Sequence, residues 1–159
     1  MPNRVVRHDR SQSVRAACLG ALSALLAGCV APAPTPPREL VVSATDYAFG
    51  SVPAELSAGP VQFRMENQGK VPHEMALGQL SAGVTADSMM AYLAGGGEPA
   101  ELSDGVVGIL IASPGTTSLG TLAADLVSGR TYLMICQFRD SDSLPPHAAM
   151  GMIASFVAK

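Results

Sequence analysis

The sequence predicts an all-β fold, a sandwich or barrel of short strands interrupted by one short helix. Three observations lead to this prediction. Several short segments are rich in β-branched residues or alternate apolar and polar side chains, as strands do. Glycine and proline separate these segments at regular intervals, which is typical of all-β proteins. One segment alone carries apolar residues at helical spacing.

The strands are expected between residues 39 and 157. Residues 39–45 are rich in β-branched side chains, and residues 61–66 alternate with a period of two. Pro72 places His73 at or just after the start of a strand, because proline cannot donate a ladder hydrogen bond. Further strands are predicted at 72–80, 105–112, 131–138 and 150–157, and residues 116–126 are expected to hold one strand and part of another.

The helix is predicted over residues 85–94. Thr85 is a candidate N-cap, and Asp87 places a negative charge in the first turn. Apolar residues then recur at helical spacing, and the glycines at 95–97 end the helix. Residues 98–105 read as a loop. The helix therefore interrupts the sandwich between its third and fourth predicted strands.

Residues 1–28 have the organisation of a signal peptide. Arginines precede the apolar stretch 16–27, which is too short to span a bilayer as a helix. The stretch ends in Leu-Ala-Gly-Cys at 26–29, which resembles a bacterial lipobox. This resemblance implies cleavage before Cys29, lipidation of Cys29, and attachment to the outer face of the bacterial cell membrane or to the outer membrane. The alternative is an ordinary secretory signal with an incidental cysteine.

Residues 29–37 hold the lipidation site and a linker in which four of the last six residues are proline, a composition that makes a stiff, extended spacer. The folded domain is therefore expected at 38–159. Residues 30–159 contain six Lys+Arg and twelve Asp+Glu, so their net charge is 6 − 12 = −6. This acidic balance and the absence of tryptophan argue against a nucleic-acid partner. A monomer is the default expectation.

Metal-binding side chains follow a pattern in the domain. Cys136 is the only cysteine after Cys29, so it cannot form an internal disulfide there, and His73 and His147 are the only histidines after His8. Thiolate, two imidazoles and a methionine thioether are the donor set of a blue-copper electron-transfer site. The alternative is that Cys136 is a small buried core residue.

The predicted strands bring these donors together. Cys136 ends one strand, and His147 and Met152 lie at the start of the next, so antiparallel pairing places them at one end of the sandwich. His73 begins an earlier strand that can reach the same end.

Two stretches resemble the motifs of the cupredoxins, the family of plastocyanin and azurin. The first is Asn-Gln-Gly-Lys-Val-Pro-His-Glu at 67–74. The second is Tyr-Leu-Met-Ile-Cys at 132–136, followed by Pro-His-Ala-Ala-Met-Gly-Met at 146–152. The resemblance covers roughly residues 38–159, and it implies a cupredoxin-like Greek-key β-sandwich or barrel with one short inserted helix.

The resemblance also implies a ligand set, because the family order is His, then Cys, His and Met near the C-terminus. Carried over, His73 and His147 are the imidazole ligands of one copper ion, and Cys136 is the thiolate. Met152 is the weak axial ligand, and Met150 is its rival.

One departure from the family leaves two outcomes open. Ten residues, 137–146, separate Cys136 from His147, which is longer than the usual spacing. This polar insert either bulges outward and leaves His147 in place, or it displaces His147 and spoils the site. Glu74 is either a partner of the ligands or a solvent-facing strand residue. The other methionines are spread along the chain, which favours core filling over a copper relay.

The sequence favours a membrane-anchored electron carrier with one copper ion, with a redox protein as its possible partner. A metal-free binding or structural lipoprotein and a Cu(I) storage or delivery protein are the alternatives. An enzyme is not expected. A cysteine hydrolase needs a paired base and an oxyanion site, which the sequence does not indicate, and two histidines do not suffice for the several coppers of a multicopper oxidase.

Overall fold

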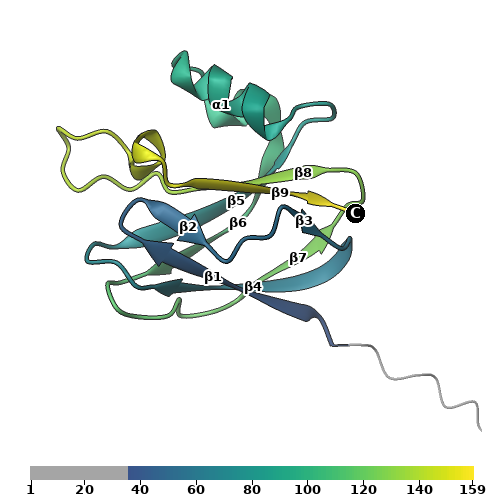
Figure 1. The fold of residues 1–159 in the computed structure, drawn as a ribbon, viewed down its shortest axis with the longest axis horizontal. Coiled ribbons are helices and arrows are strands. Elements are labelled where there is room, and N and C mark those ends of the chain that lie inside the picture. The colour runs from purple at the N-terminus through teal and green to yellow at the C-terminus, as the bar shows by residue number, and fades with distance from the viewer. Residues whose placement is uncertain (1–35) are drawn as a thin grey trace, which may run out of the picture. The chain divides into compact units, whose positions relative to one another are not determined.

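Two β-sheets pack face to face over residues 36–159, the part of the chain that the computed structural model describes. The strand orders are β2-β1-β4-β7 in one sheet and β3-β9-β8-β5-β6 in the other (Figure 1). The pairs β1–β4 and β3–β9 are parallel, and the remaining pairs are antiparallel. The predicted all-β sandwich with one short helix is therefore confirmed.

The elements of the described residues follow in chain order. They are β1 Arg38–Thr45, β2 Ala48–Gly50, β3 Glu55–Leu56, β4 Gly59–Asn67, β5 His73–Leu80, α1 Ala86–Ala94, the 3-10 turn η1 Pro99–Leu102, β6 Ser103–Ala112, β7 Leu122–Leu126, β8 Thr131–Ile135, the 3-10 turn η2 His147–Met150, and β9 Ile153–Ala158.

The core lies between the two sheets and follows from strand alternation. In β4, Val61, Phe63 and Met65 point inward and are buried, while the residues between them are partly exposed. Tyr132 stacks on Phe156 with ring centroids 5.2 Å apart. Each such buried ring contributes about 2–3 kcal/mol of hydrophobic stabilisation. The site described below lies at one end of this rigid core.

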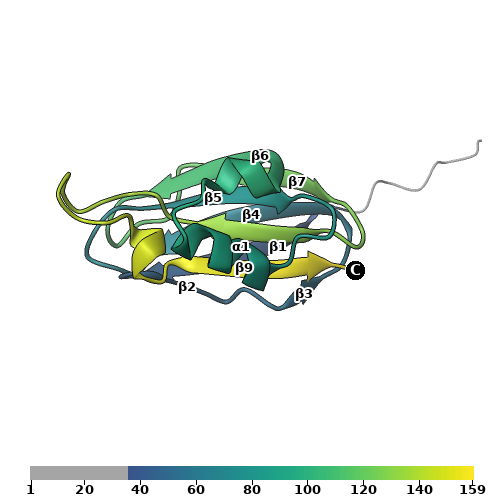
Figure 2. The same cartoon turned by 90° about the horizontal axis from the view of Figure 1, so that it is seen from above.

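Helix α1 covers the outer face of the five-stranded sheet (Figure 2). Its N-cap is Thr85, whose hydroxyl accepts a hydrogen bond from the Ser88 N–H, as the sequence predicts. Met89 is fully buried and packs in a second apolar cluster with Leu80 and Leu133. The helix therefore stabilises the sheet that carries most of the site, without entering the main core.

The expectation of one strand and part of another over residues 116–126 is wrong for its first half. Only residues 122–126 form a strand, and Thr117 makes a single isolated bridge to Glu66. The Ser118 hydroxyl accepts a hydrogen bond from the Met65 N–H and donates one to the Gly120 carbonyl oxygen. A serine side chain that bonds to the backbone in this way competes with the strand ladder.

The strand predicted from residue 150 begins instead at Ile153. Residues 147–150 form η2, and Gly151 follows in the left-handed region, with φ 108°. Glycine adopts this conformation without steric cost, so it ends the turn and redirects the chain into β9. The strand predicted over 131–138 ends at Ile135, and the predicted loop 98–105 contains η1 and the start of β6. The short strands β2 and β3 have too few residues for a periodic pattern.

The predicted signal peptide, Cys29 and linker residues 30–35 lie outside the described residues, so these expectations stay predictions. Within residues 36–159, no helix has the length and apolar character needed to cross a membrane.

Candidate metal site

His73 is placed by a tight turn between β4 and β5. The buried Asn67 side chain organises this turn, because its Nδ2 donates to the carbonyl oxygens of Val71, at 2.9 Å, and Ala112, at 3.0 Å. Its Oδ1 accepts a hydrogen bond from the Gly69 N–H at 2.8 Å. The turn ends where β5 begins, at His73, as Pro72 predicts. The imidazole therefore sits on a backbone fixed by three hydrogen bonds.

His147 is placed by backbone hydrogen bonds that continue the pairing beyond β8. The His147 N–H donates to the Phe138 carbonyl oxygen at 2.8 Å, and the Ala148 N–H donates to the Cys136 carbonyl oxygen at 2.8 Å. The Cys136 N–H donates to the Met152 carbonyl oxygen at 3.2 Å. These bonds close the base of the long insert, so the insert bulges outward and His147 stays beside Cys136.

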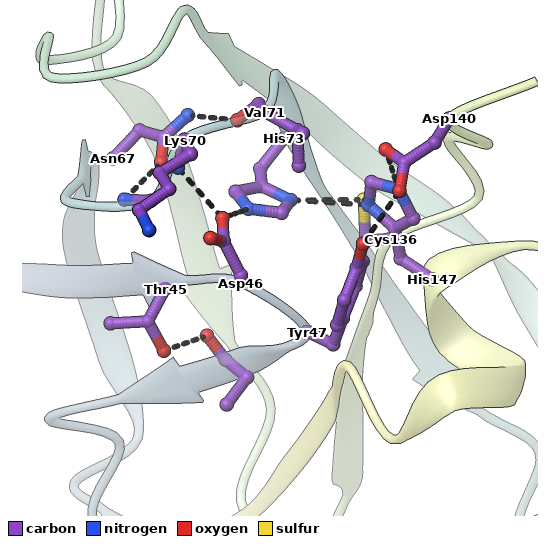
Figure 3. A network of polar contacts seen from close by, with 12 residues as sticks. Thr45, Asp46, Tyr47, Asn67, Lys70, Val71, His73, Cys136, Asp140 and His147 are labelled. Carbon is purple, nitrogen blue, oxygen red and sulfur yellow. Dashed lines mark hydrogen bonds and ion pairs between the residues drawn. The ribbon is translucent and has the colours of Figure 1, made fainter.

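The three predicted donors converge on one point (Figure 3). Cys136 Sγ lies 3.4 Å from His147 Nδ1 and 4.0 Å from His73 Nδ1, and the two Nδ1 atoms are 3.2 Å apart. His73 and Cys136 have no exposed surface, and His147 is 1% exposed. The structure thus brings together, away from water, two imidazoles and a thiol that are far apart in the sequence.

Burial sets the protonation of His73 and Cys136. It lowers the pKa of His73, so that imidazole is neutral and keeps a lone pair on one ring nitrogen. It raises the pKa of the Cys136 thiol, so the sulfur is protonated near neutral pH in the absence of a metal. A cation at the convergence point would displace that proton and be bound by the thiolate.

Glu74 supports the sulfur and is buried, with 9% of its surface exposed. Its backbone N–H donates to Cys136 Sγ at 3.4 Å, and its Oε1 accepts a hydrogen bond from the Gln137 N–H at 2.8 Å. Of the two interpretations left open by the sequence, the solvent-facing one is therefore wrong. Glu74 contacts the thiol region of the site and not an imidazole ring.

The two candidate axial methionines differ in burial. Met152 has no exposed surface and belongs to the same apolar cluster as Cys136, and its N–H donates to the His147 carbonyl oxygen at 3.0 Å. Met150 is 36% exposed. Four of the five other methionines in residues 36–159 are fully buried, which supports the core-filling interpretation; these are Met65, Met75, Met89 and Met134.

Three polar residues around the imidazoles were not predicted. Asp140 Oδ1 lies 3.0 Å from His147 Nε2, and Asp46 Oδ1 lies 3.5 Å from His73 Nε2. The Tyr47 hydroxyl donates to Asp140 Oδ2 at 2.5 Å. Asp46 and Tyr47 form the turn between β1 and β2, and Asp140 lies in the long insert (Figure 3). No motif in the sequence distinguishes them from other polar turn residues.

These polar residues have shifted proton affinities. The backbone N–H of Lys70 is the main cause of the lowered pKa of Asp46, and the Tyr47 hydroxyl is the main cause of the lowered pKa of Asp140. The same Asp140 carboxylate raises the pKa of Tyr47. Both carboxylates are therefore ionised and the phenol is protonated at neutral pH.

The donor set fits one copper ion. A thiolate and two imidazoles suit copper and zinc better than magnesium or calcium, and two histidines with one cysteine are the donors of trigonal blue-copper sites. The three donor atoms lie within 4.8 Å of one another and are buried, so one ion could contact all three. His73, His147 and Cys136 therefore fit a single copper ion, the metal that the sequence predicts.

Solved structures resemble the chain, although no protein-family model and no curated protein matches it. Auracyanin B aligns with a TM-score of 0.53 and 20% identity, over 79% of this chain and 91% of its own. Auracyanin A, a "blue" copper protein from the green thermophilic photosynthetic bacterium Chloroflexus aurantiacus, aligns with a TM-score of 0.47 and 24% identity, over 77% and 99%. A multicopper oxidase aligns with a TM-score of 0.41 and 20% identity, over 77% of this chain and 42% of its own.

The likeness to auracyanin B establishes the fold class. Auracyanins are blue-copper cupredoxins, and the alignment with auracyanin B covers most of both chains. The fold implied by the sequence motifs is thus confirmed: residues 36–159 contain a cupredoxin fold with one added helix.

Proposed function

We propose that this protein is an exported, membrane-anchored cupredoxin that binds one copper ion and transfers electrons. The observation that carries the proposal is the buried convergence of His73 Nδ1, His147 Nδ1 and Cys136 Sγ, with each pair within 4.8 Å. Met152 is the proposed axial ligand, because its side chain is buried in the cluster that contains Cys136, whereas Met150 is 36% exposed.

The way the donors are held suits electron transfer. A bound copper ion supplies a one-electron Cu(II)/Cu(I) couple. The chain supplies rigidity, because His73 starts a central strand and the backbone bonds of His147 and Ala148 fix the other two donors. Donors that cannot move much keep the geometry similar in both oxidation states, which lowers the reorganisation that accompanies each electron transfer.

A role as an electron carrier is favoured over an enzymatic one. Cys136 and His73 have no exposed surface, so a substrate would have to displace packed side chains to reach the sulfur. An electron, in contrast, needs no open path to the donors.

The N-terminal sequence supports the proposed location. The apolar stretch and Leu-Ala-Gly-Cys at 26–29 favour export and lipidation of Cys29. The proline-rich linker would hold the domain away from the membrane surface. We infer that its partner there is a redox protein, and that the acidic domain acts as a monomer without nucleic acid.

The proposal is tested by titrating the metal-free protein with Cu(II) while visible absorption and EPR spectra are recorded. We expect one copper per chain and an intense thiolate-to-copper band, both lost in Cys136→Ser. Met152→Leu is expected to change the EPR parameters, and Met150→Leu, as its matched control, is expected to leave them unchanged.

Other outcomes identify the alternatives. Stoichiometric Cu(I) binding without a coloured Cu(II) form would indicate storage or delivery. An absence of copper binding would contradict the proposal and leave a metal-free binding domain.

A further inference from the structure

The outer nitrogens of the two imidazoles each face a carboxylate. We propose that Asp140 is a positioning residue that aims His147 Nδ1 at the copper ion, with Tyr47 holding Asp140 in place, and that the charges of Asp140 and Asp46 together lower the reduction potential of the ion. This inference rests on the proposed function, because it concerns the same site. It gives the long insert and the β1–β2 turn a role in that site.

Asp140 is held on both of its oxygens. Oδ1 lies 3.0 Å from His147 Nε2, and Oδ2 accepts the Tyr47 hydroxyl at 2.5 Å. The Tyr47 ring also packs edge-on against the His147 ring, with centroids 5.0 Å apart and an interplanar angle of 72°. An ionised carboxylate at Nε2 requires a proton on that nitrogen, which leaves the Nδ1 lone pair facing Cys136. Asp140 therefore selects the tautomer and the ring orientation that bind a metal.

Asp46 acts on His73 at longer range. The two groups are 3.5 Å apart, and His73 Nε2 is buried without a hydrogen-bond partner in the described residues. Asp46 is anchored by the Lys70 N–H at 2.7 Å. A Cβ atom on Gly69 would lie 2.3 Å from Asp46 Oδ1 and 3.0 Å from His73 Nε2, so glycine leaves room for this approach. The carboxylate thus influences the buried imidazole through its charge.

A single turn supplies both contacts. Asp46 and Tyr47 are the two residues between β1 and β2, and Tyr47 has a φ of 69°. This conformation is unusual for a bulky side chain and costs on the order of 1–3 kcal/mol unless other contacts hold it. The contacts to Asp140 and to the His147 ring supply that constraint. The strained turn therefore directs Asp46 toward His73 and Tyr47 toward His147.

The charges have a definite electrostatic consequence. Two carboxylates behind the imidazoles stabilise Cu(II) more than Cu(I), because the attraction grows with the charge of the ion. The Asp46 and Asp140 side chains are 34% and 25% exposed, so water screens part of this effect. Removal of either charge should therefore raise the reduction potential.

The test uses the full chain in mild detergent, loaded with copper, and measures the reduction potential together with Cu(II) affinity. Asp140→Asn and Asp46→Asn keep the side-chain size and remove one charge each. We expect an upward shift of the potential in both, and a loss of Cu(II) affinity of about 10- to 100-fold in Asp140→Asn. Asp140→Glu restores the charge, and its potential should lie closer to that of the parent protein.

Asp142→Asn is the matched control, because it removes the same charge from the same loop and Asp142 has no hydrogen bond or ion pair to a histidine in the described residues. It should shift the potential far less than Asp140→Asn. Equal shifts in these two variants, or an unchanged potential in both Asp140→Asn and Asp46→Asn, would overturn the inference. Thermal unfolding of the metal-free variants shows whether each is folded, and Asp140→Ser or Asp46→Ser, which also remove one charge, replace an asparagine variant that is not.

The two proposals fail in different ways. If the parent protein forms no coloured copper site, the proposed function fails whatever the variants do. If the parent protein forms the site and the carboxylate variants keep its potential, only the present inference fails.

Discussion

The two histidines reach one site from two unlike regions of the molecule. His73 follows a tight turn that the buried Asn67 fixes with three hydrogen bonds. His147 follows a loop whose residues 139–145 are exposed, and its backbone is fixed by hydrogen bonds at the base of that loop. Both imidazoles are nevertheless buried and lie within 3.2 Å of each other at Nδ1. The position of each imidazole thus depends on the hydrogen bonds that fix the backbone next to it, more than on the length of the preceding loop.

Loop entropy explains why the long insert is tolerated. The entropic cost of closing a flexible loop grows only with the logarithm of its length, so each doubling costs about 0.6 kcal/mol. The hydrogen bonds from His147 to Phe138 and from Ala148 to Cys136 offset such a cost. The two regions should therefore differ sharply in their sensitivity to substitution.

The largest effect is expected in the tight turn. Asn67→Ala leaves the carbonyl oxygens of Val71 and Ala112 without this donor inside the protein. We expect the free energy of unfolding of the metal-free protein to fall by about 2–4 kcal/mol. Urea denaturation measures it, with Gln68→Ala, an exposed neighbour, as the control that should change little. Equal stabilities of the two variants would show that the turn is not fixed by Asn67.

Gly69→Ala tests the close approach in the same turn. The added Cβ would meet Asp46 Oδ1 at 2.3 Å, so the carboxylate and His73 must shift. Overpacking of this kind costs about 1–3 kcal/mol, and copper affinity should fall as well. Gly120→Ala is the matched control, because nothing lies within 4 Å of its added Cβ. If both alanines have the same effect in urea denaturation and copper titration, the space at Gly69 is not needed.

The pH dependence of Cu(I) binding concerns Cys136, which lies between the two regions. Burial raises the pKa of this thiol and lowers the pKa of His73 from their ordinary values, so binding near neutral pH releases the thiol proton and none from His73. Affinity should therefore rise about tenfold per pH unit between about pH 7 and 8.5. Competition with a Cu(I) chelator of known affinity measures this slope. A flat profile would mean that Cys136 is already ionised or is not a ligand.

The smallest effect is expected in the exposed loop. Arg139 donates to the Leu144 carbonyl oxygen at 2.6 Å, but both residues are exposed. Arg139→Ala should change the free energy of unfolding by less than about 0.5 kcal/mol and leave copper affinity unchanged. Differential scanning calorimetry and copper titration check both values. A loss as large as that of Asn67→Ala would mean that the loop itself holds His147.

The sequence was sufficient where local chemistry decides the structure. Alternation in β4 and the cap at Thr85 predicted a strand and the helix, and Pro72 predicted that a strand begins near His73. The donors could be proposed because Cys136, His73 and His147 have few other roles in a domain that holds one cysteine and two histidines. Their order along the chain then matched a known family pattern.

The sequence was not sufficient where tertiary contacts decide. Asp46, Tyr47 and Asp140 resemble any other polar turn residues until the fold brings them to the imidazoles. The strand predicted at residue 116 was wrong because the Ser118 side chain bonds to the backbone in place of a ladder. The placement of His147 depends on backbone hydrogen bonds that close the base of the ten-residue insert. The pattern of apolar and polar residues does not reveal such bonds.

The most direct test of the central claim is nitrogen NMR of the Cu(I)-loaded domain, residues 30–159, labelled with 15N-histidine. This domain contains only two histidines, His73 and His147, so each ring gives an assignable pair of signals. We predict that both rings show a copper-bound Nδ1 and a protonated Nε2, and that both change on removal of copper. A ring that keeps a free Nδ1, or that titrates like an exposed imidazole in the loaded protein, would contradict the account.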